Sequence, residues 1–239
     1  MTTTIALITG ANKGIGLETA RQFGACGFTV LAGARDEERG LSAERELRAD
    51  GVDARFVSLD VTADASVREA ADWIEREYGR LDILVNNAGI ARGNPASETN
   101  LDTMREVYEA NVFGVIRVTN AMLPLLRRAL AARIVNVSSE VGSISSMTDP
   151  ASPLAQMPMA SLAYPSSKAA LNMLTIKWAR AHPRWRVNAA DPGFTATDLN
   201  SQRGTQTVHE GTEAIVRLAS VGPDGPTGTF ADRLGAVPW

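Results

Sequence analysis

Short apolar runs of strand length alternate along this chain with stretches of helical spacing, and no other feature restricts the fold as strongly. The runs are almost entirely apolar, which predicts strands that are buried on both faces, as in parallel sheets. Regular alternation of strand and helix is typical of right-handed βαβ units. We therefore expect an α/β fold with one doubly wound parallel sheet of about seven strands and helices on both faces.

The expected elements follow from this pattern. Strands are predicted at residues 5–9, 29–33, 55–59, 83–85, 133–137 and 186–190, with one more short strand after Gly222. Helices are predicted within 17–24, 41–47, 67–78 and 101–130. No internal repeat and no linker rich in Pro, Gly and Ser divides the 239 residues, so we expect a single domain over 1–239.

One segment breaks the alternation. Residues 143–163 carry three prolines and three methionines and are predicted to form an irregular loop. Long loops inside compact domains are commonly functional, so we expect a substrate-side insertion at about 141–162. Its methionines (Met147, Met157 and Met159) and Leu154 either form an adaptable apolar wall over a substrate or pack against the protein's own helices.

Charge and hydropathy exclude several classes of partner. A net charge of −3 supplies no basic excess to neutralise a phosphate backbone, which argues against nucleic-acid binding. The longest apolar stretch, 121–137, contains one proline and three arginines and cannot span a membrane. No signal-like segment begins the sequence, so we expect a cytoplasmic protein. Cys26, the only cysteine, is expected to be buried on an apolar helix face.

A glycine-rich turn follows the first predicted strand. It reads Thr9-Gly10-Ala11-Asn12-Lys13-Gly14-Ile15-Gly16 and leads into the first predicted helix. Glycines in this place permit a tight turn and let backbone N–H groups approach a pyrophosphate at a helix N-terminus. A plain strand-to-helix turn also tolerates glycine. The strand before it and the helix after it favour a dinucleotide site.

The end of the second predicted strand indicates which nucleotide binds. NAD-binding domains tend to place a carboxylate there for the ribose hydroxyls. This strand ends in Ala34-Arg35, with no acid before Asp36. Arg35 can pair a 2′-phosphate, and Lys13 can add a second positive charge. Arg39 is either a third or a solvated surface charge. These cations favour NADP(H) over NAD(H).

Candidate catalytic groups lie in the second half of the chain. Tyr164 and Lys168 are four residues apart and can share one helix face. A nearby ammonium stabilises phenolate, so we expect Lys168 to lower the Tyr164 pKa toward the working range. The predicted strand at 133–137 is followed by Ser138 and Ser139 at the carboxyl edge of the sheet, where ligands of α/β proteins bind. The two serines are expected to point to opposite faces.

Taken in order, these motifs resemble the compact short-chain dehydrogenase/reductase family, in a form similar to carbonyl reductases. The resemblance rests on Thr-Gly-x-x-x-Gly-x-Gly at Thr9, Asn-Asn-Ala-Gly at Asn86, a serine at the end of the fifth strand and Tyr-x-x-x-Lys at Tyr164. It extends from Thr9 to about Thr197. It implies a single Rossmann-type sheet and hydride transfer between NADP(H) and a carbonyl or alcohol, with no metal.

The resemblance also implies roles for individual residues. The implied catalytic residues are Asn111, Ser139, Tyr164 and Lys168, with Ser139 orienting the substrate oxygen and Asn111 holding a water that links Lys168 to solvent. The implied cofactor-binding residues are Gly10, Asn12, Lys13, Gly14, Ile15, Gly16, Arg35, Asp60, Val61, Asn87, Ala88, Gly89, Tyr164, Lys168, Pro192, Gly193, Thr195 and Thr197.

Three questions stay open in the sequence. The gap between Ser139 and Tyr164 is longer than in most compact members, and in some carbonyl reductases such an insertion covers the helices used for tetramer formation. Monomer and homo-oligomer are therefore both possible states. Asp191 stands where relatives more often have a small residue, and its carboxylate either favours the oxidised nicotinamide or points away. The alternative to a reductase of a small-molecule carbonyl is a catalytically silent NADP(H)-sensing protein.

Overall fold

Seven parallel strands form one sheet in the computed structural model, which describes residues 3–93, 95–156 and 161–239. Their order across the sheet is β3-β2-β1-β4-β5-β6-β7, and each neighbouring pair is parallel. The strands are β1 (Ile5–Thr9), β2 (Thr29–Ala34), β3 (Ala54–Ser58), β4 (Ile83–Asn86), β5 (Arg133–Val137), β6 (Arg186–Ala190) and β7 (Phe230–Ala231). The expected parallel sheet is confirmed.

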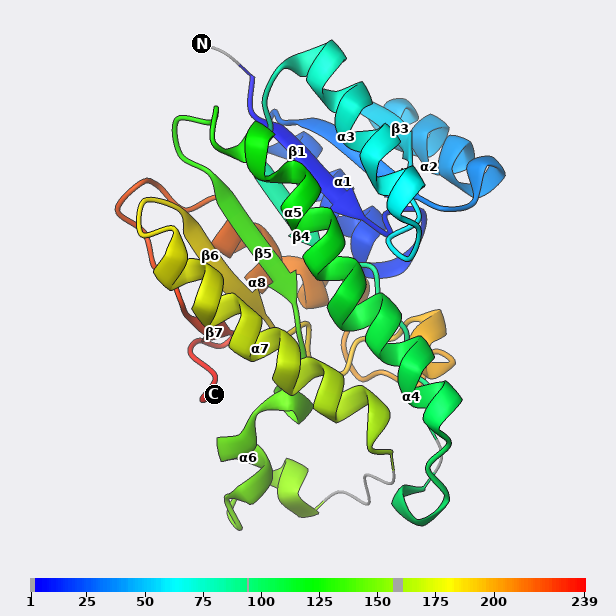
Figure 1. Cartoon of the computed structure of the whole chain (residues 1–239), viewed down its shortest axis with the longest axis vertical. Coiled ribbons are helices and arrows are strands. Elements are labelled where there is room, and N and C mark those ends of the chain that lie inside the picture. Colours follow the sequence, from blue (N-terminus) through cyan, green and yellow to red (C-terminus); the bar gives the residue numbers. More distant parts are fainter. Residues whose placement is uncertain (1–2, 94, 157–160) are drawn as a thin grey trace.

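Helices cover both faces of the sheet (Figure 1). On one face pack α1 (Gly14–Ala25), α2 (Glu37–Ala49) and α8 (Val208–Ala219). On the other pack α3 (Asp64–Tyr78), α5 (Gly114–Leu126) and α7 (Ala163–Ala181). The shorter helices α4 (Leu101–Tyr108) and α6 (Ile144–Thr148) lie beyond the carboxyl ends of the strands, at the bottom of the view. The expected doubly wound Rossmann-type arrangement is therefore confirmed.

Two apolar cores explain why the strands are parallel and buried. Leu7 and Leu84 point into the core beneath α3, α5 and α7, whereas Ile8 and Val85 point into the core beneath α1, α2 and α8. All four side chains are fully buried. A strand with both faces covered reads as a continuous apolar run, which is the pattern present in the sequence.

The strand order places a crevice between β1 and β4. From β1 the chain winds outward through β2 to β3 and then returns to β4 on the other side of β1. The chain runs from β1 toward β2 and from β4 toward β5, in opposite directions across the sheet. The loops after β1 and β4 therefore diverge at the sheet edge. Ligands of open α/β sheets bind in such a crevice.

A ladder of buried amides and hydroxyls crosses the sheet next to this crevice. Asn86 Nδ2 donates to Asn136 Oδ1 at 2.8 Å and to Thr119 Oγ1 at 3.1 Å. Asn136 Nδ2 donates in turn to Thr175 Oγ1 at 2.8 Å. Asn136 is fully buried, so its two hydrogen bonds replace those it would make with water. The ladder joins β4, β5, α5 and α7 side by side.

The structure corrects two expected elements. The helix expected over 101–130 is interrupted by a π-helical turn at Glu109–Phe113 and ends at Leu126. The loop expected over 143–163 contains α6, because the Ser143 hydroxyl accepts from Ser146 N at 3.0 Å and caps a first turn. Met157 and Met159 lie outside the described residues.

The expected burial of Cys26 is wrong. Helix α1 ends at Ala25, and Cys26 occupies the C-cap, followed by Gly27 with φ of 75°. The residue therefore lies past the packed face of the helix and is exposed. No helix in the described stretches has the length and apolar character that crossing a membrane requires.

Replacing Asn136 by alanine is expected to destabilise the fold by about 2 kcal/mol, because buried partners lose their hydrogen bonds and a gap opens beside them. The measurement is urea unfolding of Asn136→Ala. Asn120→Ala, on the exposed side of α5, is the matched control and is expected to change the free energy of unfolding by less than about 0.5 kcal/mol. Equal effects of the two variants contradict the role of the ladder.

Candidate active site

The glycine turn packs closely against Asn87 and Ala88, the first residues after β4. Gly10 and Gly14 have φ of 66° and 54°, values that residues with a side chain rarely adopt. A Cβ added at Gly16 would lie 2.6 Å from Asn87 Nδ2, and one at Gly10 would lie 3.0 Å from Ala88 Cα. Gly10 and Gly16 are therefore required by the close approach of neighbouring chain atoms, and Gly14 by its backbone conformation. The turn leads into α1, whose first N–H groups have no side-chain cap.

Thr9 and Asn87 join the ends of β1 and β4. The Thr9 hydroxyl oxygen accepts from Asn87 N at 3.0 Å and from Ala88 N at 2.9 Å. In return, Asn87 Nδ2 donates to Thr9 O at 2.8 Å and to Gly10 O at 3.1 Å. Four hydrogen bonds thus fix the floor of the crevice. Alignment of backbone groups here fits a pyrophosphate placed over the turn.

At the end of β2 the side chains match a phosphate better than a hydroxyl. Asp36 is the N-cap of α2 and accepts from Arg39 N at 2.9 Å, so its carboxylate already serves the helix. Arg35 is exposed, and within the described stretches no carboxylate forms an ion pair with it. Lys13 lies on the neighbouring turn, where its Nζ is 2.7 Å from Asp198 Oδ2. Arg39 is also exposed and lies 3.9 Å from Asp36 Oδ2.

Asp60 and Val61 form the wall after β3. Asp60 Oδ1 accepts from Thr62 N at 2.9 Å, which fixes the turn. Val61 O accepts from Arg117 of α5 at 2.7 Å, so the wall is tied to the helix layer. Both residues are partly exposed at the same edge as the glycine turn.

Tyr164, Lys168 and Ser139 meet at the carboxyl end of β5. Tyr164 and Lys168 belong to the first turns of α7, and Lys168 Nζ lies 5.5 Å from the centre of the Tyr164 ring. The same Nζ donates to Val137 O at 2.8 Å. The Ser139 side chain hydrogen-bonds that of Tyr164. Ser138 points the other way and donates to Asn172 Oδ1 at 2.5 Å, as the strand alternation predicts.

The electrostatics of this group differ from the expectation. Burial, followed by the negative charge of Asp191, raises the pKa of Tyr164 to about 12, although the hydrogen bond from Ser139 acts in the opposite direction. Burial lowers the pKa of Lys168 to about 8, and Asp191 opposes that shift. The expected net lowering of the Tyr164 pKa is thus wrong for this structure, because burial and the charge of Asp191 outweigh the hydrogen bond from Ser139.

Asn111 lies in the π-helical turn between α4 and α5. Its Nδ2 donates to Ile90 O at 2.9 Å and to Ser167 Oγ at 3.1 Å, and its Oδ1 accepts from Ile90 N at 2.9 Å. A Cβ at Gly89 would lie 3.0 Å from Asn111 Oδ1 and 3.8 Å from Lys168 Nζ. Asn111 is therefore beside Lys168, and its side chain holds the loop after β4. Turns of this kind occur frequently at functional sites.

The loop after β6 completes the edge. Pro192 O accepts from Thr195 Oγ1 at 2.8 Å, which folds Gly193 into a turn with φ of 68°. Thr197 lies over the glycine turn, since a Cβ at Gly14 would be 3.5 Å from Thr197 Cγ2. The segments implied to hold the two ends of a dinucleotide therefore lie along one continuous edge of the sheet.

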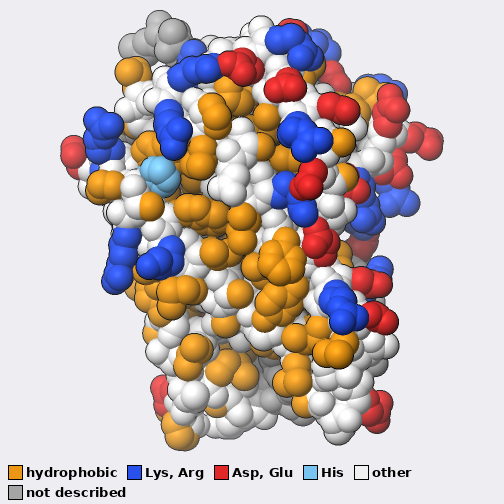
Figure 2. Space-filling view, viewed as in Figure 1, with side chains coloured by type: hydrophobic (Ala, Val, Ile, Leu, Met, Phe, Trp, Pro, Cys, Tyr) orange, Lys and Arg blue, Asp and Glu red, His pale blue; other side chains and the backbone are white. Residues whose placement is uncertain are grey.

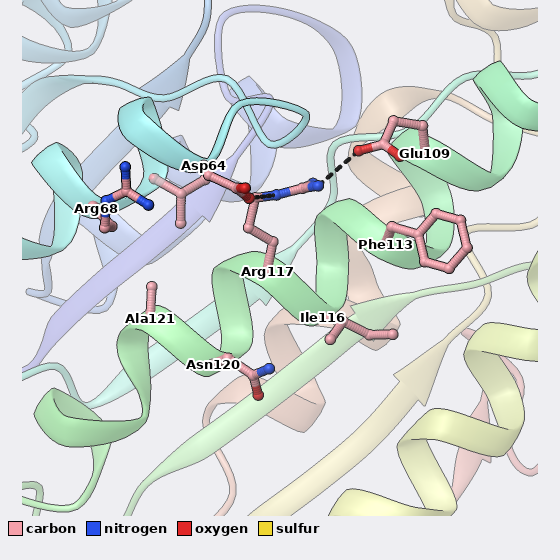
Figure 3. Close-up of a pocket in the computed structure, with 9 residues that line it drawn as sticks. Asp64, Arg68, Glu109, Phe113, Ile116, Arg117, Asn120 and Ala121 are labelled. Atoms are coloured by element: carbon pink, nitrogen blue, oxygen red, sulfur yellow. Dashed lines mark hydrogen bonds and ion pairs between the residues drawn. The ribbon is translucent and has the colours of Figure 1, made fainter.

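A separate hollow lies away from this edge, between α3 and α5 (Figure 3). It is an open groove of about 500 Å³, and Arg117 crosses its upper wall between Asp64 and Glu109. None of the expected site residues lines it. On the same side of the molecule, apolar side chains gather over α5 and α7 (Figure 2). Within the described ranges, no cluster of His, Cys, Asp or Glu is placed to hold a metal ion.

Sequence reasoning left the partners of three site residues unassigned. Asp198 pairs with Lys13, Ser167 accepts from Asn111, and Glu140 contributes a backbone hydrogen bond to Asp191. Glu140 directly follows the site serine, so its place could be inferred. The Lys13–Asp198 pair joins positions 185 residues apart, and no spacing rule predicts it.

Comparisons with known proteins agree with this geometry. The family model described as "short chain dehydrogenase" matches residues 4–207. "Short-chain dehydrogenase/reductase 1" of Saponaria officinalis is 37% identical over 98% of this chain and 95% of its own length. Salutaridine reductase of Papaver bracteatum is 32% identical over 95% of this chain and 93% of its own.

A solved structure extends the likeness to three dimensions. The NADPH-bound carbonyl reductase from chicken fatty liver superposes with a TM-score of 0.86 at 32% identity, and the alignment covers 100% of both chains. The family model matches well over half of this chain, and the motifs that carry the resemblance lie together at one sheet edge. The chain belongs to the short-chain dehydrogenase family.

Proposed function

We propose that this chain reduces a ketone, aldehyde or quinone with NADPH, and oxidises the corresponding alcohol in the reverse direction. The observation that carries the proposal is the hydrogen-bonded pair of hydroxyls on Ser139 and Tyr164, with Lys168 beside them. They lie on the same edge as the glycine turn. Salutaridine reductase and the NADPH-bound carbonyl reductase, both similar over nearly the whole chain, support it.

Each residue has a defined task in the proposed reaction. NADPH, when bound, supplies the hydride that reduces the carbonyl carbon. Tyr164 donates a proton to the carbonyl oxygen, and Ser139 steadies that oxygen with a second hydrogen bond. Lys168 stabilises the phenolate left on Tyr164, and it can also contact the ribose. Asn111 is proposed to support a water that returns a proton toward Lys168.

The protonation states suit a proton donor. With its pKa raised to about 12, Tyr164 carries its proton throughout the neutral range. With a pKa of about 8, Lys168 is still largely an ammonium at neutral pH. The site therefore holds one proton to give and one positive charge to stabilise what remains, without a change in either group before the substrate arrives.

The cofactor residues fit NADP(H). Gly10 and Gly16 allow the glycine turn to pack against Asn87 and Ala88, and its backbone N–H groups at the start of α1 suit a pyrophosphate. Arg35 presents a cation at the end of β2 where the nearest carboxylate, Asp36, caps α2. Lys13 supplies a second cation on the adjacent turn, after exchange of its Asp198 partner for a phosphate.

Further features of the chain remain predictions. We propose one cofactor-binding domain over 1–239, with the insertion at about 141–162 forming a wall of the substrate site, because α6 follows Ser139 at the same edge. The cytoplasmic location and the choice between monomer and homo-oligomer stay untested expectations. A catalytically silent NADP(H)-sensing protein is the alternative, and turnover separates the two.

Replacing Tyr164 by phenylalanine is expected to lower kcat for NADPH-dependent reduction by about 10²–10⁴-fold, because the proton donor is lost. NADPH oxidation is followed with a panel of ketones, aldehydes and quinones. Tyr78→Phe removes the same hydroxyl from the last residue of α3, and this control variant is expected to keep full activity. If wild-type protein binds NADPH and turns over no carbonyl, the silent alternative holds.

Replacing Arg35 by alanine is expected to weaken NADPH binding by about 10–100-fold, because a charge-assisted hydrogen bond to the 2′-phosphate contributes about 1.5–3 kcal/mol. NADH binding is expected to stay within about twofold of wild type, because NADH has no 2′-phosphate for Arg35 to bind. Fluorescence titration measures both. Arg45→Ala is the control, because Arg45 is an exposed arginine of α2, the helix that follows Arg35. A wild-type preference for NADH contradicts the assignment.

The rate of carbonyl reduction is expected to fall as pH rises through about 8. Burial lowers the pKa of Lys168 to about 8, so its stabilising charge is present below that pH and lost above it. The measurement is kcat/KM against pH at saturating NADPH. In Lys168→Arg the fall near pH 8 is expected to vanish, whatever the residual rate, because guanidinium keeps its charge. A wild-type profile that stays level through this range excludes Lys168 as the titrating group.

A further inference from the structure

Asp191 is a buried carboxylate inside the site to which the proposed reaction gives no task. It follows β6, and the residue is 6% exposed. Its Oδ1 accepts from Gly193 N at 2.9 Å, and the backbone N–H of Glu140 also hydrogen-bonds the carboxylate. Its own backbone N–H donates to Ala231 O at 2.8 Å.

These contacts join the two loops that frame the reacting atoms. Glu140 directly follows Ser139, and Gly193 is the turn of the loop after β6. The Asp191 carboxylate therefore binds backbone N–H groups of both loops. Its position depends on the main chain after β5 and β6 and not on the side-chain conformation of any loop residue. The alternative in which the side chain points away from the site is excluded by these bonds.

The charges around Asp191 come from three directions. Lys168 and Tyr164 face it from α7: Lys168 Nζ donates to Val137 O, and Val137 pairs with Ala190, the residue before Asp191. The charge of Asp191 acts on both groups. Glu140 faces it from the turn after β5, and Asp232 from the turn after β7. The one cation among these four groups is Lys168. Burial, reinforced by Glu140 and Asp232, raises the pKa of Asp191 to about 6, and the bonds from Gly193 and Glu140 oppose the shift.

We propose that Asp191 is a positioning residue whose negative charge keeps Lys168 and Tyr164 in their protonated forms, so that the site is set for carbonyl reduction in preference to alcohol oxidation. The inference rests on the proposed roles of Tyr164 and Lys168. A negative charge at close range favours an ammonium over an amine and a phenol over a phenolate. Both effects preserve the proton-donating state that reduction needs and oppose the phenolate base that oxidation needs.

The position of this carboxylate is costly to the fold, which favours a functional reason for it. A buried carboxylate with a raised pKa binds more protons in the folded chain than in the unfolded chain between about pH 4 and 6. Stability contributed by this group therefore falls as pH rises through that window. A neutral side chain of the same shape avoids this loss and still accepts one backbone hydrogen bond.

The test replaces Asp191 by asparagine and compares pH profiles of reduction. The alkaline fall of kcat/KM is expected to move to lower pH by about one unit, because both Lys168 and Tyr164 then lose their protons more readily. The plateau of alcohol oxidation is expected to begin at lower pH by a similar shift. Below about pH 6 the wild-type carboxyl is itself protonated, so the two proteins are expected to converge in rate.

Two controls separate charge from scaffold. Asp232→Asn removes another carboxylate of the same edge, one that accepts from Leu234 N and Gly235 N at 2.8 Å each, and is expected to leave the alkaline fall in place. Thermal unfolding without cofactor supplies a readout independent of turnover. The Tm of Asp191→Asn relative to wild type is expected to be higher at pH 8 than at pH 5. Asp191→Ser removes the same charge if the asparagine variant does not fold.

Several outcomes overturn the inference. If the alkaline fall of kcat/KM in Asp191→Asn stays in place or moves to higher pH, the proposed effect of the Asp191 charge is contradicted. An equal loss of rate at every pH, acid included, makes Asp191 a scaffold residue only. Tyr164→Phe is measured in parallel: if it keeps full activity, the proposed function fails first. If it is inactive while Asp191→Asn follows the wild-type profile, the function stands and this inference alone fails.

Discussion

The site depends on the junction between the ends of β1 and β4. Four hydrogen bonds connect Thr9 and Gly10 with Asn87 and Ala88 there, and the glycine turn closes on the same main chain. The strand order reverses between β1 and β4, so the loops of both halves of the sheet start from this junction. A displacement of either strand end would move the phosphate-binding turn relative to the groups on β5 and α7.

Polar groups accumulate in layers away from that junction. The buried ladder through Asn86 and Asn136 aligns β4 with β5 and reaches α7 at Thr175. About two turns of α7 closer to the edge, Lys168 Nζ donates to Val137 O. Lys168 thus belongs both to the reacting group and to the network that positions it. Because most polar atoms of these layers have hydrogen-bond partners, with Asn86 Oδ1 an exception, their burial close to the cofactor edge is compatible with a stable fold.

Much of this arrangement was predictable because the sheet is parallel. Strands buried on both faces are continuous apolar runs, and residues that follow them converge at one edge, which brings together Gly10, Ser139 and Gly193. Properties that arise only from packing were not predictable. The raised pKa of Tyr164 depends on how many protein atoms surround it, and the exposure of Cys26 depends on where α1 stops. The bonds from Glu140 and Gly193 to Asp191 require two loops to meet.

The π-helical turn at Glu109–Phe113 restricts how this part of the chain can change in length. Such a turn holds one residue more than an α-helical turn, and one residue corresponds to about 100° around the helix axis. Loss of a single residue here would restore a regular helix and remove the wide turn that holds Asn111. Asn111 would then turn away from Ile90, and Gly89 would lose its neighbour. The spacing between Asn111 and the start of α5 is therefore fixed by the register of one helix, and substitutions are tolerated there more readily than deletions.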